Sequence, residues 1–108
     1  MKEILEMTGT PDEVDWLAKE VMGWVLMPSK WKVSIWNPFK SWNDAEMVVE
    51  RMKEKKWEID LLSINGSDEY VCYFKRMSGK KPWRTVKASA ADVPTAISRA
   101  ALLTLEGT

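Results

Sequence analysis

Tryptophan and lysine gather in one stretch of this chain in a pattern that could bind a flat or anionic ligand. Residues 23–42 contain four of the seven tryptophans, and Trp31 and Trp36 are accompanied by Lys32. An exposed indole ring can stack on a nucleobase, which is worth about 1–3 kcal/mol per base, or anchor a protein partner. In an extended strand Trp31 and Trp36 point to opposite sides, because their numbers differ by an odd count. At least one of them is therefore a candidate for exposure, and packing in the core is the alternative.

The other two tryptophans of this stretch have neighbours that indicate a structural role. Trp24 follows Gly23 at the end of one predicted helix, and Trp42 follows Ser41 at the start of the next. We expect both rings to pack at helix ends. If the stretch binds a partner, Trp31 and Trp36 are the residues to examine.

A second candidate site is the basic segment "FKRMSGKKPWR", residues 74–84. Its candidate binding residues are Arg76, Lys80, Lys81, Trp83 and Arg84. Arginine can hold two phosphate oxygens at once, so Arg76 or Arg84 could form an anion site. A solvated hairpin loop is the alternative, since most local runs of charge are solvent-exposed. The glycine and lysine spacing of a P-loop is absent.

Composition excludes several kinds of chemistry. The chain has no histidine and a single cysteine, Cys72, so histidine-based catalysis, thiolate clusters and an intramolecular disulfide are all ruled out. Sixteen basic residues balance sixteen acidic ones, whereas proteins that bind duplex nucleic acid usually carry a basic excess. Apolar neighbours in "YVCYF" indicate that Cys72 is a buried hydrophobe. We expect no catalytic residue, no metal ligand, no cofactor and no duplex nucleic acid as partner.

Hydrophobic periodicity predicts an α+β fold. "TPDEVDWLAKEVMG" has a cap, a proline and a capping-box glutamate before an apolar stripe, and Asn65-Gly66 favours a hairpin turn. The predicted helices are residues 11–22, 41–56 and 92–107, and the predicted strands are 57–64, 69–76 and 82–90, with a further candidate at 30–36. Because both faces of these strands carry apolar residues, we expect a three-layer α/β/α sandwich. Its central antiparallel sheet has three or four strands, with helices on both faces, in a single domain spanning residues 1–108.

Three blocks of the chain resemble a known family. They are "LAKEVMGW" (17–24), "PFKSWNDAEMVVERMKEKKW" (38–57) and "TAISRAALLTLEG" (95–107), and they are similar to the matching blocks of phage ABA-sandwich-domain proteins. These are small proteins of bacteriophages and prophages. The resemblance implies a sandwich fold and a phage-type origin. It implies no catalytic residues, since none are established for the family.

Three classes of function remain open. We expect a non-catalytic binding protein that acts on host machinery through a protein–protein surface. The alternative is a sponge that sequesters a small anionic ligand, such as a nucleotide immune signal, and a small enzyme of unknown reaction is the second alternative. No signal peptide or membrane span is found, so the expected location is the cytoplasm of the bacterial host cell. Homo-oligomers are also expected, because a small chain rich in tryptophan can bury an exposed patch against its own copy.

Overall fold

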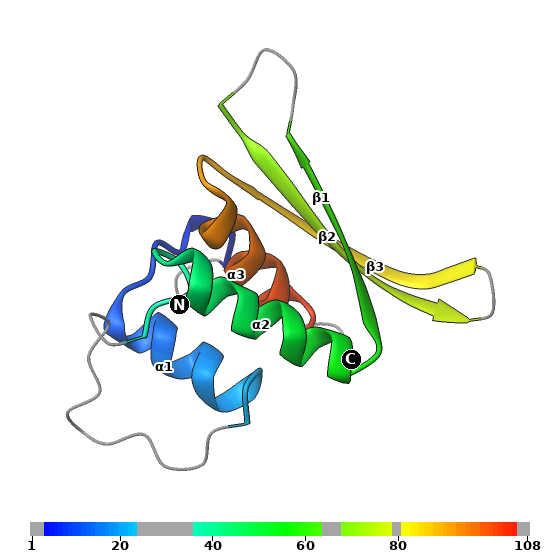
Figure 1. Ribbon diagram of the computed structural model, residues 1–108, viewed down its shortest axis with the longest axis horizontal. Coiled ribbons are helices and arrows are strands. Elements are labelled where there is room, and N and C mark those ends of the chain that lie inside the picture. Colours follow the sequence, from blue (N-terminus) through cyan, green and yellow to red (C-terminus); the bar gives the residue numbers. More distant parts are fainter. Residues whose placement is uncertain (1–3, 24–35, 64–67, 79–80, 106–108) are drawn as a thin grey trace.

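Three helices and three strands occur in the predicted order, and a computed structural model shows how they pack (Figure 1). The structure describes residues 4–23, 36–63, 68–78 and 81–105, and for residues 77–78 and 81–83 only the backbone. The elements are η1 (Ile4–Glu6), α1 (Pro11–Glu20), α2 (Trp42–Glu54), β1 (Trp57–Ser63), β2 (Tyr70–Ser78), β3 (Lys81–Ala90) and α3 (Val93–Leu103). The candidate strand at 30–36 lies outside the described residues except for its last position.

Two helices begin at the polar residues that the sequence singles out as caps. Ser41 Oγ accepts a hydrogen bond from the backbone N–H of Asp44 at 3.3 Å. Asp92 Oδ1 accepts one from the backbone N–H of Thr95 at 2.9 Å. These bonds satisfy N–H groups that have no partner within the helix. The predicted starts of α2 and α3 are confirmed.

One carboxylate holds the turn that precedes α1. Glu13 is buried, with 7% of its surface exposed, and its Oε1 accepts hydrogen bonds from three successive backbone N–H groups. The donors are Thr8 at 3.1 Å, Gly9 at 2.9 Å and Thr10 at 3.0 Å. Gly9 has a φ of +99°, and a Cβ at this position would lie 2.7 Å from the Cβ of Phe39. The turn therefore needs glycine both for its backbone conformation and for the space around it.

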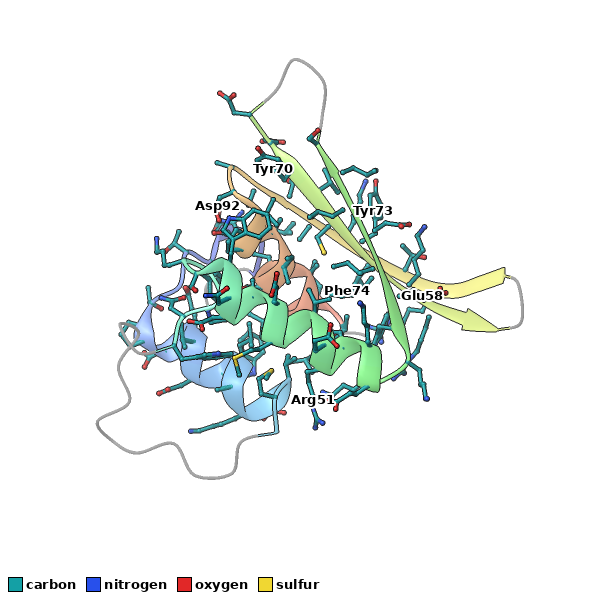
Figure 2. All side chains as sticks on the ribbon, viewed as in Figure 1. Arg51, Glu58, Tyr70, Tyr73, Phe74 and Asp92 are labelled. Atoms are coloured by element: carbon teal, nitrogen blue, oxygen red, sulfur yellow. The ribbon has the colours of Figure 1, made fainter. Side chains whose placement is uncertain are left out.

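The sheet has the strand order β1-β2-β3, and both pairs are antiparallel. Phe74 in β2 is paired with Ile59 in β1 and with Val86 in β3, so these three side chains share one face. Phe74 points toward the helices, whereas the neighbouring Tyr73 and the more distant Glu58 point away from them (Figure 2). The predicted hairpin of two antiparallel strands is confirmed.

Helices α2 and α3 cover the face of the sheet that carries Phe74, and α1 packs on α3 on the side away from the sheet (Figure 1). Nine of the eleven residues of α3 are buried, because this helix contacts β2 and β3 on one side and α1, α2 and η1 on the others. Ala96, Ala100 and Ala101 have no exposed surface. Their small side chains allow the close approach that the sequence predicts.

The α+β sandwich of helices packed on an antiparallel sheet is confirmed, but the described helices cover only one face of the sheet (Figure 1). The other face, which we call the open face, is formed by Glu58, Asp60, Leu62, Val71, Tyr73, Lys75, Thr85, Lys87 and Ser89. Helices were expected on both faces of the sheet, and within the described residues they cover one face. The physical reason lies in the strand alternation, since four of these nine side chains are charged and are solvated at low cost.

Candidate functional site

Trp57, Arg76 and Arg84 form a row across one end of the sheet, which we call the cationic row. Arg76 is directly paired with both Trp57 in β1 and Arg84 in β3, so the three side chains share the helical face. The Cζ atoms of Arg76 and Arg84 lie 4.8 Å and 5.6 Å from the centroid of the Trp57 ring. Trp57 is only 4% exposed, and both arginines are half-buried. The indole ring is therefore a rigid base on which two guanidinium groups stack.

Arg76 and Arg84 place two positive charges directly opposite each other on neighbouring strands. Like charges directly opposite each other on neighbouring strands destabilise a sheet. Arg76 donates a hydrogen bond from Nη2 to the carbonyl oxygen of Lys55 at 3.0 Å, and this acceptor carries no net charge. Burial, then the guanidinium groups of Arg51 and Arg76, lower the pKa of Lys55 from its ordinary value, against the opposing effect of Glu20. With Lys55 close to Arg76, this end of the sheet gathers several positive side chains that could bind an anion.

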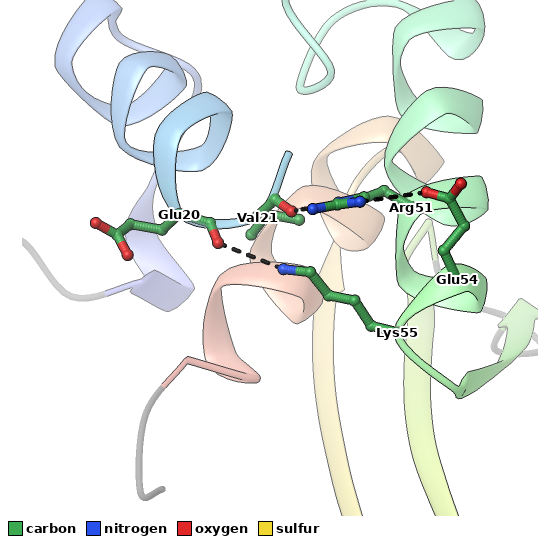
Figure 3. Close-up of polar contacts among 5 residues, drawn as sticks. All are labelled: Glu20, Val21, Arg51, Glu54 and Lys55. Carbon is green, nitrogen blue, oxygen red and sulfur yellow. Dashed lines mark hydrogen bonds and ion pairs between the residues drawn. The ribbon is translucent and has the colours of Figure 1, made fainter. Parts of the chain in front are cut away.

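Two further cations next to the row join α1 to α2 (Figure 3). Arg51 Nε donates to the carbonyl oxygen of Val21 at 3.2 Å, and Lys55 Nζ donates to that of Glu20 at 3.4 Å. Both acceptors lie at the end of α1, where carbonyl groups lack helical partners. Arg51 also pairs with Glu54 at 3.5 Å. We therefore assign Arg51 and Lys55 a structural role. Lys55 is thereby also held where its backbone carbonyl accepts from Arg76.

The structure brings together two of the residues that the sequence analysis selected, Arg76 and Arg84. Candidates whose placement lies outside the described residues are Trp31, Lys32 and Lys80, and for Lys81 and Trp83 only the backbone is described, as part of β3. Sequence reasoning missed Trp57 and Lys55. The signal for Trp57 is the register of the predicted hairpin, because Trp57 in β1 is paired with Arg76 in β2.

The two described tryptophans of the Trp-rich stretch lie in different environments: Trp36 has the core packing that the sequence analysis gave as the alternative to exposure, and Trp42 is more exposed than expected. Trp36, a candidate for exposure, is 4% exposed and belongs to the hydrophobic core. Trp42, expected to pack at a helix end, is 58% exposed at the first residue of α2. Asn37 explains the burial of its neighbour: its side chain donates to the carbonyl of Gly9 at 3.1 Å and accepts from the N–H of Phe39 at 3.0 Å. This fixes the segment against the turn before α1 and directs Trp36 inward.

Two hollows lie away from the cationic row. One, of about 850 Å³, follows the outer face of α2 and is lined by acidic, basic and apolar side chains, among them Glu50, Arg51 and Met47. The other, of about 440 Å³, lies on the open face around Leu62 and Tyr73. Among the described residues, no group of three carboxylate or thiol side chains is placed to hold a metal ion.

Cys72 is expected to be inert toward thiol reagents in the folded protein. It has no exposed surface, and burial, with a smaller contribution from Asp60, raises the pKa of its thiol to about 12. Because the thiolate is the reacting species, Ellman's reagent at about pH 8 should label none of the native protein. Labelling should reach one thiol per chain in concentrated guanidinium chloride. Rapid labelling without denaturant would contradict the burial of Cys72 beneath the helices.

Comparison with known families agrees with this architecture. Residues 15–102 match the sequence model described as the phage ABA sandwich domain, from within α1 to the end of α3. The chain belongs to the phage ABA sandwich domain family. The matched range of this ABA sandwich domain includes all three residues of the cationic row. No curated protein matches the chain. Within the described residues, none of the helices has the length and apolar character needed to cross a bilayer.

Proposed function

We propose that this protein is a non-catalytic binding protein of phage type that acts in the cytoplasm of the bacterial host, where the cationic row contacts an acidic surface of a host protein. The observation that carries the proposal is the direct opposition of Arg76 and Arg84 on one buried tryptophan. Two guanidinium groups on adjacent strands can together hold the oxygens of a carboxylate on a partner surface. Arginine and tryptophan are also the residues most enriched at the energetic centres of protein interfaces.

A protein surface fits the cationic row because the positive charge extends beyond the two arginines. Lys56 is exposed next to Trp57, and Lys53, which pairs with Glu50 at 3.8 Å, is exposed in the last turn of α2. Positive side chains therefore spread over the junction of α2 and β1 as well as the sheet. An array of this width matches several carboxylates on a partner surface, and such complementarity increases the association rate.

Replacing both arginines by glutamine is expected to weaken binding of the host partner by at least about 30-fold, the effect of losing roughly 2 kcal/mol at an interface hot spot. The partner is recovered from host lysate on immobilised protein and quantified by mass spectrometry. Its affinity for the purified protein is then measured by biolayer interferometry. Binding should also weaken as the salt concentration rises.

The matched control is the variant Lys19→Gln, Lys40→Gln, which removes two exposed positive charges on other parts of the fold. A captured protein supports the proposal only if it is lost with Arg76→Gln, Arg84→Gln and retained with the control. Equal capture by the two variants would refute the role of the cationic row. Thermal unfolding of each variant confirms that it is folded.

A small phosphorylated ligand is the second candidate, because guanidinium groups on adjacent strands can hold the oxygens of one phosphate together. Pyrophosphate and a panel of linear and cyclic nucleotides are the probes. An increase in melting temperature with one of them, abolished by Arg76→Gln, Arg84→Gln, would favour this ligand class over a protein partner.

A further inference from the structure

The side chains of the open face are ordered in three rows, each with one residue from every strand. The rows are Glu58–Lys75–Thr85, Asp60–Tyr73–Lys87 and Leu62–Val71–Ser89. Successive rows are two residues apart along the strands, or about 7 Å. The acidic residues of this face stand on β1, and Lys87 stands on β3. The face is therefore polarised across the strands, from acidic to basic.

The third row contains a large exposed side chain beside a space that could receive one. Leu62 is 54% exposed, the most of any leucine on the described strands. The hollow of about 440 Å³ extends from Leu62 across Val71 to Ser89 and is bounded by Leu5 of η1. Leu5 is itself 50% exposed. Exposed leucines around a hollow are typical of a surface that binds another protein.

We propose that the open face binds the open face of a second copy of this chain, about a two-fold axis that runs along β2. A half-turn about this axis leaves β2 over the partner's β2 and places β1 over the partner's β3. Because the axis crosses the rows at right angles, each row lies over the same row of the partner. Two sheets that pack face to face are rotated by about 30° relative to each other. At β1 and β3 this rotation shifts the facing side chains sideways by less than the separation of the rows.

One symmetry operation then satisfies two kinds of complementarity at once. Asp60 faces the partner's Lys87, so opposite charges meet. Leu62 faces the partner's Ser89, so a large side chain enters the hollow above a small one. Each contact occurs twice, as a two-fold interface requires. Lys75 lies near the axis, where Glu58, its direct cross-strand neighbour, and Asp60 together offset its charge.

This interface leaves the cationic row free, because Arg76 and Arg84 lie on the helical face of the sheet. A dimer would carry two such rows. The inference rests on the open face alone and stands or falls independently of the proposed partner.

Sedimentation equilibrium tests the dimer through charge reversal. The wild-type chain of 12.5 kDa should approach twice this mass as its concentration rises. Asp60→Lys places lysine against the partner's Lys87, and Lys87→Asp places aspartate against the partner's Asp60, so each variant alone should sediment as a monomer. Mixing the two variants should restore the dimer, because both ion pairs then form between unlike chains. The dissociation constant of each single variant should exceed that of the mixture by at least about tenfold.

Leu62→Arg and Leu61→Arg form a matched pair, since both leucines are exposed on β1 but only Leu62 lies on the open face. Leu62→Arg should abolish the dimer, and Leu61→Arg should preserve it. Circular dichroism checks that each variant is folded. A wild-type protein that stays monomeric up to about millimolar concentration, or variant mixtures that remain monomers, would overturn the proposal. If Leu61→Arg abolished the dimer as completely as Leu62→Arg, the interface would not be the open face.

Discussion

Replacement of Trp36 by alanine is expected to lower the free energy of unfolding by about 3–5 kcal/mol, the usual cost of emptying a buried tryptophan site. Trp36 is 4% exposed and belongs to the main hydrophobic cluster, and the segment that carries it is fixed by Asn37. Since domains of this size are stable by only about 5–15 kcal/mol, this loss is a large part of the total stability. Urea denaturation followed by circular dichroism measures the change.

Trp42→Ala is the internal comparison for this prediction, because the same substitution is made where the ring is 58% exposed. Its free energy of unfolding should stay within about 0.5 kcal/mol of the wild-type value. A similar loss of stability in both variants would show that the environments of the two rings differ less than the structure indicates.

Replacement of Glu13 by alanine is expected to cost about 3 kcal/mol, since hydrogen bonds to a charged group contribute about 1.5–3 kcal/mol and unpaired buried donors add a penalty. The carboxylate of Glu13 accepts hydrogen bonds from three backbone N–H groups in the turn before α1. The hydrogen bond from the N–H of Gly9 is buried. No other acceptor in the turn could replace all three bonds. The free energy of unfolding is again measured with urea.

Glu13→Gln serves as the graded control, because its amide oxygen can still accept from the same donors but carries no charge. Its loss of stability should be about half that of Glu13→Ala. Glu46→Ala, on the exposed face of α2, should change the free energy of unfolding by less than about 0.5 kcal/mol. If Glu13→Ala proved as mild as Glu46→Ala, the turn before α1 would not depend on this carboxylate.

Local patterns of this chain were sufficient for the helices and the hairpin. A cap before an apolar stripe satisfies the first N–H groups of a helix through neighbours three residues apart, as Ser41 and Asp92 do. Alternation of side chains and the turn at Asn65-Gly66 indicated two antiparallel strands, which pair as predicted. Each of these features depends on residues close in sequence, so sequence analysis recovers it.

Burial of individual aromatic residues could not be predicted in this way. Strand parity left open which of Trp31 and Trp36 is exposed, and the environment of Trp36 is set by Asn37, which bonds to Gly9 at a separation of 28 residues. The helix-end position of Trp42 indicated packing, but no described element covers this end of α2 closely enough to bury the ring. Contacts between distant segments decide both cases.

The cationic row could be predicted from the sequence only in part. The basic segment identified Arg76 and Arg84 as candidates, and their types alone indicated anion binding. Their opposition across two strands depends on the register of β2 and β3, which shifts at an irregularity between Arg76 and Met77. Trp57 joins them only because β1 pairs with β2 at the same level. A change of one residue in either register would place one of these side chains on the other face of the sheet.

The amino-acid sequence by itself determined the family, the order of helices and strands, the capped helix starts and the absence of histidine-based chemistry. All of these follow from residue types and from neighbours a few positions apart. Only the tertiary structure decided which face of the sheet the helices cover, which tryptophan is buried and which two arginines stack on the indole ring of Trp57. These features arise where segments distant in the sequence pack together, and packing energy depends on shape and register that no local pattern contains.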